Sequence, residues 1–147
     1  MNKKLKIFLF IVATALVAGL LVWNYVNKAS DDFADKKVDA TFSFEQLIDK
    51  TANDTSSLSQ LKDKLVGLNG TIKKMNKETN SITLEIGDTT SMSSVICQID
   101  PRYLESFSKI HEGEQIKIKG KLTGFTIDTE LGLGNTVEMN FCTIDKQ

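Results

Sequence analysis

The chain has 147 residues, of which 41% are hydrophobic and 25% are charged, as in a globular protein with one domain and an additional segment. All 19 acidic residues follow residue 27 but three of the 18 basic residues precede it, so residues 28–147 carry a formal net charge of −4. A mildly acidic domain repels polyphosphate at long range, which argues against general nucleic-acid binding.

The N-terminal sequence predicts a membrane-spanning helix. The basic start MNKKLK precedes an uncharged run of 20 residues from Ile7 to Val26. As a helix, such a run extends about 30 Å, the thickness of a hydrocarbon core. Trp23 and Tyr25 are typical of the membrane interface, and the preceding lysines place the N-terminus in the cytoplasm. We therefore expect membrane contact through residues 5–27 and an extracytoplasmic domain at the plasma (inner) membrane.

A cleaved signal peptide is the alternative, because it also has a basic start, an apolar middle and small residues. Its apolar region usually runs only about 7–15 residues, whereas here the run continues through Trp23. We favour an uncleaved signal-anchor over residues 1–27, although the sequence does not decide whether the segment is cleaved. The polar residues 28–42 are interpreted as a linker and residues 43–147 as a folded domain.

A helix is predicted at the start of that domain. Ser43 and Gln46 form a capping box, and Phe42 before the cap can contact Leu47. The polar stretch NDTSS (residues 53–57) weakens this helix, and LSQLKDK (58–64) indicates a second one.

Period-two alternation then predicts five strands. They cover residues 65–75, 81–86, 94–100, 115–125 and 136–145. A short helix in DPRYLESFSKI, with Asp100 as N-cap and Pro101 at the first position, separates the third strand from the fourth. In the fourth strand, Lys117, Lys119 and Lys121 share one face, which we interpret as solvated.

Three strands, one helix and two strands is the order of an OB-fold. Gly70 and Gly120 lie inside strands, where glycine often marks a bend at a barrel corner. We therefore expect a mainly β protein: a five-stranded OB-fold barrel with a helix between strands 3 and 4, preceded by an N-terminal helix and a single transmembrane helix. Another small barrel or a sandwich is the alternative.

Several of these segments resemble the tRNA_anti-like family of bacterial OB-fold proteins. The resemblance covers roughly Phe44 to Ile144 and lies in FEQLIDKTAND, LKDKLVGLNGTI, SVICQID, GEQIKIKGKLTGF and VEMNFCTI. The strands with Cys97 and Cys142 look like the family's cysteine-bearing strands. The family has no agreed activity, so the resemblance implies the fold and contributes no catalytic residues.

The two cysteines are interpreted as small buried hydrophobic residues, although a disulfide is permitted outside the cytoplasm and the sequence does not decide between the two. We expect no metal site, since His111 is the only histidine and no close Cys or His spacing is present. No cofactor motif is recognised. An enzyme is not expected either, because no nucleophile elbow and no Ser, His and Asp pattern occurs.

OB domains that bind single strands use the face of strands two and three, with aromatic stacking platforms. Here that face presents Thr83, Glu85, Ile96 and Gln98, without an aromatic residue or a lysine. The preferred function is therefore a membrane-anchored binding module of the cell envelope for a protein, peptide or glycan. Its ligand-groove candidates are Thr83, Glu85, Ile96, Gln98 and, in the loop 126–136, Asp128 and Glu130. A single-stranded nucleic-acid-binding domain is the alternative.

Overall fold

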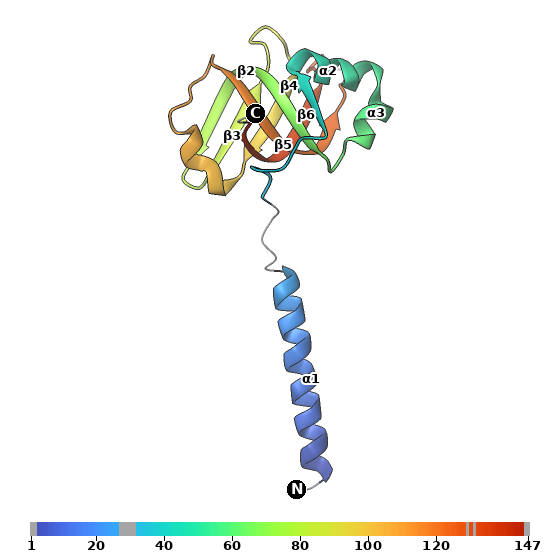
Figure 1. The fold of residues 1–147 in the computed structure, drawn as a ribbon. Coiled ribbons are helices and arrows are strands. Elements are labelled where there is room, and N and C mark those ends of the chain that lie inside the picture. Colours follow the sequence, from blue (N-terminus) through green and yellow to red (C-terminus); the bar gives the residue numbers. More distant parts are fainter. Residues whose placement is uncertain (1–2, 27–31, 129, 131, 146–147) are drawn as a thin grey trace. The chain divides into compact units, whose positions relative to one another are not determined.

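The computed structural model describes residues 3–26, 32–128, 130 and 132–145 (Figure 1). The chain divides into two compact units, Met1–Asp31 and Asp32–Gln147, and each is described by itself.

The first unit contains helix α1 (Lys3–Val26). Among the residues that the structure describes, no helix is long and apolar enough to cross a membrane. The transmembrane helix predicted from the sequence is therefore corrected to an N-terminal helix.

The second unit is a closed barrel. Its strands are β1 (Ala40–Ser43), β2 (Leu65–Glu78), β3 (Ser81–Ile86), β4 (Ser94–Ile99), β5 (Gln115–Thr126) and β6 (Thr136–Ile144). They pair in the order β1-β2-β3-β4-β6-β5, and β2 also pairs with β5, which closes the barrel. The pair β4–β6 is parallel, whereas β2–β3, β3–β4, β5–β6 and β2–β5 are antiparallel.

The helix predicted between strands 3 and 4 is confirmed as the 3₁₀-helix η1 (Pro101–Phe107), which lies between β4 and β5. Its Phe107 is fully buried in the core. Asp100 is the N-cap, as predicted, and its carboxylate accepts the backbone N–H of Arg102 at 3.0 Å. The five strands β2–β6 and this helix confirm the OB-fold.

Two helices precede the barrel, α2 (Phe44–Asn53) and α3 (Thr55–Gln60). The capping box is confirmed: the Gln46 N–H donates to Ser43 Oγ at 3.3 Å, and the Ser43 N–H donates to Gln46 Oε1 at 3.0 Å. The short strand β1 was not predicted. It pairs in parallel with the first half of β2, from Ala40 opposite Val66 to Ser43 opposite Asn69.

Residues 32–39, which the sequence places in a linker, are bonded to the barrel. The Asp39 N–H donates to the Leu65 carbonyl at 2.7 Å, and the Leu65 N–H donates back to Asp39 Oδ2 at 3.0 Å. The ring of Phe33 lies 6.2 Å from the ring of Phe141. This part of the chain therefore belongs to the folded unit.

The predicted solvated lysine face is wrong for one of its three members. Lys119 is only 2% exposed, and its Nζ donates to the Lys36 carbonyl at 3.0 Å. Lys121 pairs with Asp63 at 2.9 Å, and Lys117 is exposed. The residues that cover Lys119 come from outside β5, so the alternation within that strand could not show its burial.

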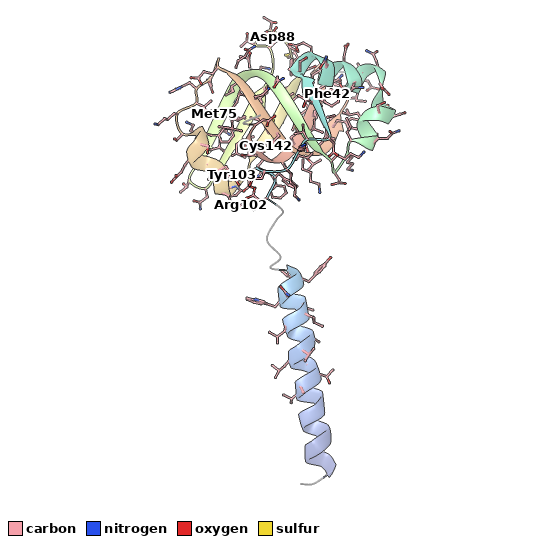
Figure 2. All side chains as sticks on the ribbon, viewed as in Figure 1. Phe42, Met75, Asp88, Arg102, Tyr103 and Cys142 are labelled. Atoms are coloured by element: carbon pink, nitrogen blue, oxygen red, sulfur yellow. The ribbon has the colours of Figure 1, made fainter. Side chains whose placement is uncertain are left out.

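Cys97 and Cys142 are both fully buried and free. Figure 2 labels Cys142 within the barrel. Burial raises the pKa of the Cys142 thiol well above its ordinary value, and a hydrogen bond with Cys97 raises it further. Gly120 lies beside this pair, because a Cβ at that position would overlap the Cys142 sulfur. The prediction of buried cysteines is confirmed.

Candidate functional site

Four of the predicted site residues lie together on one exposed surface of the barrel. Thr83 of β3 pairs with Gln98 of β4, and Glu85 pairs with Ile96. Ile96 and Gln98 are exposed, whereas Thr83 and Glu85 are half-buried. We call these four residues the β3–β4 face. Their alternation with buried neighbours was sufficient to predict them as one surface.

The β3–β4 face is polar and of mixed charge. Lys73 Nζ lies 3.4 Å from Glu85 Oε1 and donates to the Ser91 carbonyl at 2.9 Å. On the other side, Glu138 of β6 is paired with Ile96. The face therefore combines one exposed aliphatic side chain with carboxylates, and none of its four residues offers an aromatic ring on which a base could stack.

Asp128 and Glu130 belong to the loop between β5 and β6. The Asp128 carboxylate accepts the N–H groups of Glu130, at 3.1 Å, and of Leu133. Asn135 anchors the loop, because its Nδ2 donates to Thr51 Oγ1 of α2 at 2.8 Å. Asp128 thus shapes the loop through these hydrogen bonds.

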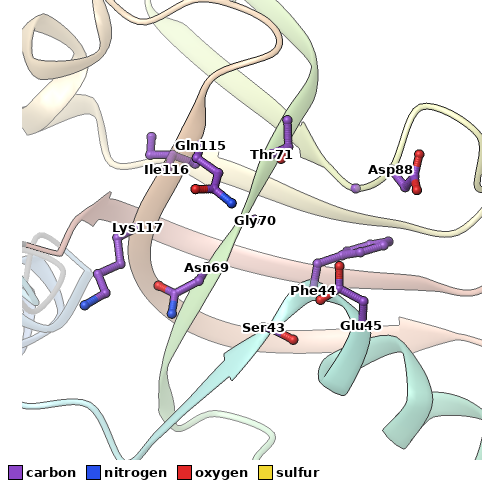
Figure 3. Close-up of a pocket in the computed structure, with 11 residues that line it drawn as sticks. Ser43, Phe44, Glu45, Asn69, Gly70, Thr71, Asp88, Gln115, Ile116 and Lys117 are labelled. Carbon is purple, nitrogen blue, oxygen red and sulfur yellow. The ribbon is translucent and has the colours of Figure 1, made fainter.

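A groove that the sequence did not predict lies on the neighbouring part of the barrel (Figure 3). Its volume is about 580 Å³. We call it the β2–β5 groove, and its lining residues are Ser43, Phe44, Glu45, Asn69, Gly70, Thr71, Gly87, Asp88, Gln115, Ile116 and Lys117.

Two rows of paired residues form the β2–β5 groove. In the first row, Asn69 of β2 lies between Ser43 of β1 and Lys117 of β5. In the second, Thr71 pairs with Gln115, and its carbonyl accepts the Gly87 N–H at 3.0 Å. The groove therefore lies where β2 passes from pairing with β1 to pairing with β3.

Gly70, between the two rows, is required by close packing. A Cβ at this position would lie 2.5 Å from Ile86 Cγ2 and 3.3 Å from Phe44 Cβ. A larger residue would push α2 or β3 away from β2. Gly70 thus keeps the start of α2 at the edge of the groove.

Asn69 carries the most unusual atom of the groove. Its Oδ1 is buried and has no hydrogen-bond partner among the residues that the structure describes. Native proteins pair nearly all such atoms, and an unpaired one indicates a ligand, a water or strain. Side chains alternate between the two faces of a strand, so LVGLNGTI places Asn69 and Thr71 on the face opposite to Leu68. The polar row could therefore be read from the sequence, but the concave shape could not.

The charges of the β2–β5 groove are separated. Figure 3 shows Lys117 on one side of Asn69, and Glu45 and Asp88 on the other. The backbone N–H and the hydroxyl of Thr90 donate to Asp88, which lowers the pKa of this carboxyl below its ordinary value of 3.8. Asp88 is therefore ionised at neutral pH.

The titratable side chains that line the groove, Glu45, Asp88 and Lys117, are exposed. Within the described ranges, no group of three or more His, Cys, Asp or Glu side chains could hold a metal ion. The single histidine, His111, is exposed and contacts Glu114 at 3.2 Å.

Comparison with known proteins agrees with this fold. The model of the tRNA_anti-like family matches residues 1–132, which includes β2–β5 and ends before β6. A candidate nucleic acid-binding lipoprotein from Klebsiella pneumoniae is similar in structure, with a TM-score of 0.56 and 13% sequence identity, over 80% of this chain and 100% of that chain. Among curated proteins, none matches this chain.

Two further solved structures are more distant. An OBody bound to hen egg-white lysozyme has 14% identity and a TM-score of 0.41, over 58% of this chain and 84% of that chain. The aspartyl-tRNA synthetase of Entamoeba histolytica has 14% identity and a TM-score of 0.44, and the match covers 76% of this chain but 21% of the synthetase. At 13% identity, the likeness to the Klebsiella protein shows the fold alone.

Proposed function

Because the chain belongs to the tRNA_anti-like family and folds as an OB barrel, we propose that it is a non-catalytic binding module. The β2–β5 groove is the site at which it binds its ligand. The observation that carries this proposal is Asn69 Oδ1, a buried acceptor without a hydrogen-bond partner in the described structure. A ligand that donates a hydrogen bond to this atom satisfies it.

A buried acceptor without a hydrogen-bond partner lowers the stability of the folded protein. Leaving a buried polar atom unsatisfied costs about 1–3 kcal/mol, whereas an apolar side chain of similar shape carries no such cost. Buried polar groups without partners, like other violations of the rules that stabilise a fold, are found mainly at functional sites. Asn69 also lies opposite Ser43 of β1 on one side and opposite Lys117 of β5 on the other, so polar residues flank this atom.

The β3–β4 face extends this binding site. Lys73 follows Thr71 by two residues on β2, and its ammonium pairs with Glu85. A ligand longer than the groove passes Lys73 and reaches Thr83, Ile96 and Gln98. The ligand classes compatible with such a polar surface are a peptide segment of a protein partner and a glycan.

Single-stranded nucleic acid is the second candidate. The name of the Klebsiella protein, which matches over its whole length, favours it. The β3–β4 face opposes it, because Glu85 and Glu138 would lie against phosphates. The two ligand classes differ in salt dependence, since displacement of counterions by a nucleic acid makes its affinity fall steeply with salt.

The test uses the full chain labelled with ¹⁵N. Three probes are added in turn: N-acetyl-trialanine amide, chitotriose and a dodecamer of thymidylate. We expect the peptide or the saccharide to shift the Asn69 side-chain amide and the backbone amides of Thr71 and Gln115. Asn76→Ala should behave as the parent does, whereas in Asn69→Ala the backbone amides of Thr71 and Gln115 should not move. Shifts confined to the dodecamer and lost at high salt would establish the second candidate. If no probe moves any resonance of the groove, the proposal is wrong.

A further inference from the structure

Resting on the proposed function, we propose that the β2–β5 groove binds a short extended peptide with free ends. The peptide lies across β2, with its ammonium group at Glu45 and Asp88 and its carboxylate at Lys117. This assignment depends on charges of opposite sign on the two sides of one hydrogen-bonding atom, with Glu45 and Asp88 on one side and Lys117 on the other (Figure 3).

The order of the side chains across the sheet is fixed by strand register. Lys117 is opposite Asn69 on β5, and Ser43 is opposite Asn69 on β1. Glu45 follows Ser43 by two residues at the start of α2. Asp88 follows Gly87, whose N–H is bonded to the Thr71 carbonyl. Both acidic side chains therefore lie on the side of β2 opposite to Lys117.

The length of the ligand follows from strand spacing. Neighbouring strands lie about 4.8 Å apart, so the two spacings from β5 across β2 to β1 measure roughly 10 Å. An extended chain covers at most about 3.3–3.6 Å per residue, so a peptide of about three residues spans this distance. A free amino acid is too short to bring its ammonium and carboxylate to both sides.

The centre of the groove fits a peptide bond. A peptide N–H donates to the buried Asn69 Oδ1, and the peptide carbonyls accept from the hydroxyl of Thr71 and the amide of Gln115. The apolar atoms of Phe44 and Ile116, which line the groove, contact a small side chain of the peptide. An anionic polymer would meet Glu45 and Asp88 with like charge, and an uncharged glycan makes no use of the charge separation.

The experiment compares four forms of trialanine by titration of the full chain: with both ends free, N-acetylated, C-amidated, and blocked at both ends. We expect the form with free ends to bind most tightly. Blocking either end weakens binding about two- to fivefold, the effect of one exposed ion pair. The ammonium and the carboxylate contribute independently, so the doubly blocked form is the weakest.

Charge variants assign each end to its side. The double variant Glu45→Gln with Asp88→Asn should lose affinity for the free-amine peptides and leave the N-acetylated forms unchanged. Lys117→Gln should lose affinity only for peptides with a free carboxylate. Glu105→Gln and Lys109→Gln, which are exposed substitutions on or next to η1, are the matched controls and should bind as the parent does.

The result that overturns this assignment is equal binding of the free and blocked peptides, or charge variants that weaken all four peptides alike. If the doubly blocked peptide still shifts the Asn69 amide in that case, the groove remains a binding site and only the ligand class is wrong. If none of the four peptides binds and chitotriose does, the ligand is a glycan. If no peptide and no saccharide binds, the proposed function of the groove fails with it.

Discussion

Lys119 and Asp145 form an ion pair inside the folded unit: Lys119 Nζ lies 3.9 Å from Asp145 Oδ1, with side chains that are 2% and 8% exposed. The same ammonium donates to the Lys36 carbonyl at 3.0 Å. Lys119 of β5 therefore binds two segments that are far apart in the sequence, one before β1 and one after β6. Buried charges of this kind are tolerated only when paired.

Substitution Lys119→Met should strongly destabilise the folded unit. It removes the buried ammonium that pairs with the Asp145 carboxylate, and breaking a buried pair in this way costs about 3–5 kcal/mol. The free energy of unfolding, measured by urea denaturation, checks this value. Lys121→Met is the matched control on the same strand, because its partner Asp63 is exposed and its effect should be much smaller. Equal effects of the two variants would show that Lys119 is not a buried partner.

Substitution Asn69→Leu should stabilise the protein while it removes ligand binding. The change replaces an unsatisfied buried acceptor by an apolar group of similar size, which we expect to raise the free energy of unfolding by about 1 kcal/mol. Thermal and urea unfolding measure the gain, and Asn76→Leu on the same strand controls for strand propensity. A loss of stability in Asn69→Leu would mean that Oδ1 has a partner in solution.

Substitution Arg102→Gln should reduce stability in a pH-dependent manner. Arg102 Nε donates to Asp100 Oδ1 at 2.9 Å, and this holds the pKa of Asp100 below its ordinary value of 3.8. A lowered carboxyl pKa stabilises the folded state above that ordinary value, and the contribution is lost as the pH falls through the folded-state pKa. The difference in unfolding free energy between parent and variant should therefore be full at neutral pH and vanish in strong acid. A difference that is independent of pH contradicts this assignment.

Alkylation by iodoacetamide should leave Cys142 unmodified in the native protein. The thiolate is the reacting species, and burial together with Cys97 raises the pKa of this thiol. Mass spectrometry after brief treatment at neutral pH is expected to show no adduct, and treatment in denaturant to show two. Rapid native modification at Cys142 would mean that the strands around Gly120 open frequently.

Local patterns in the sequence were sufficient for most of the barrel. The alternation of Ile82, Leu84 and Ile86 with polar neighbours predicted β3, and the capping box of Ser43 predicted the start of α2. Strand β1 has only four residues, and it forms because β2 offers it a parallel partner, which is a non-local contact that periodicity does not record.

The candidate site was only half accessible to sequence reasoning. The β3–β4 face depends on alternation within two adjacent strands, and it was predicted correctly as a surface. The β2–β5 groove depends on α2, β1 and β5 meeting around Asn69, so its shape exists only in the folded chain. Lys119 shows the same limit, since the residues that bury it are distant in sequence.

The attachment of residues 32–39 decides where the smallest independent folding unit begins. Asp39 and Leu65 exchange two hydrogen bonds, and Tyr103 donates to Asp32 at 2.7 Å, so this stretch unfolds together with the strands. A protease acting on the native protein will therefore leave a resistant core that starts near Asp32 rather than at Ser43. Shortened versions of the protein that begin at α2 will lack Asp39 and Lys36. The Leu65 N–H and the Lys119 ammonium will then lose the acceptors to which they now donate.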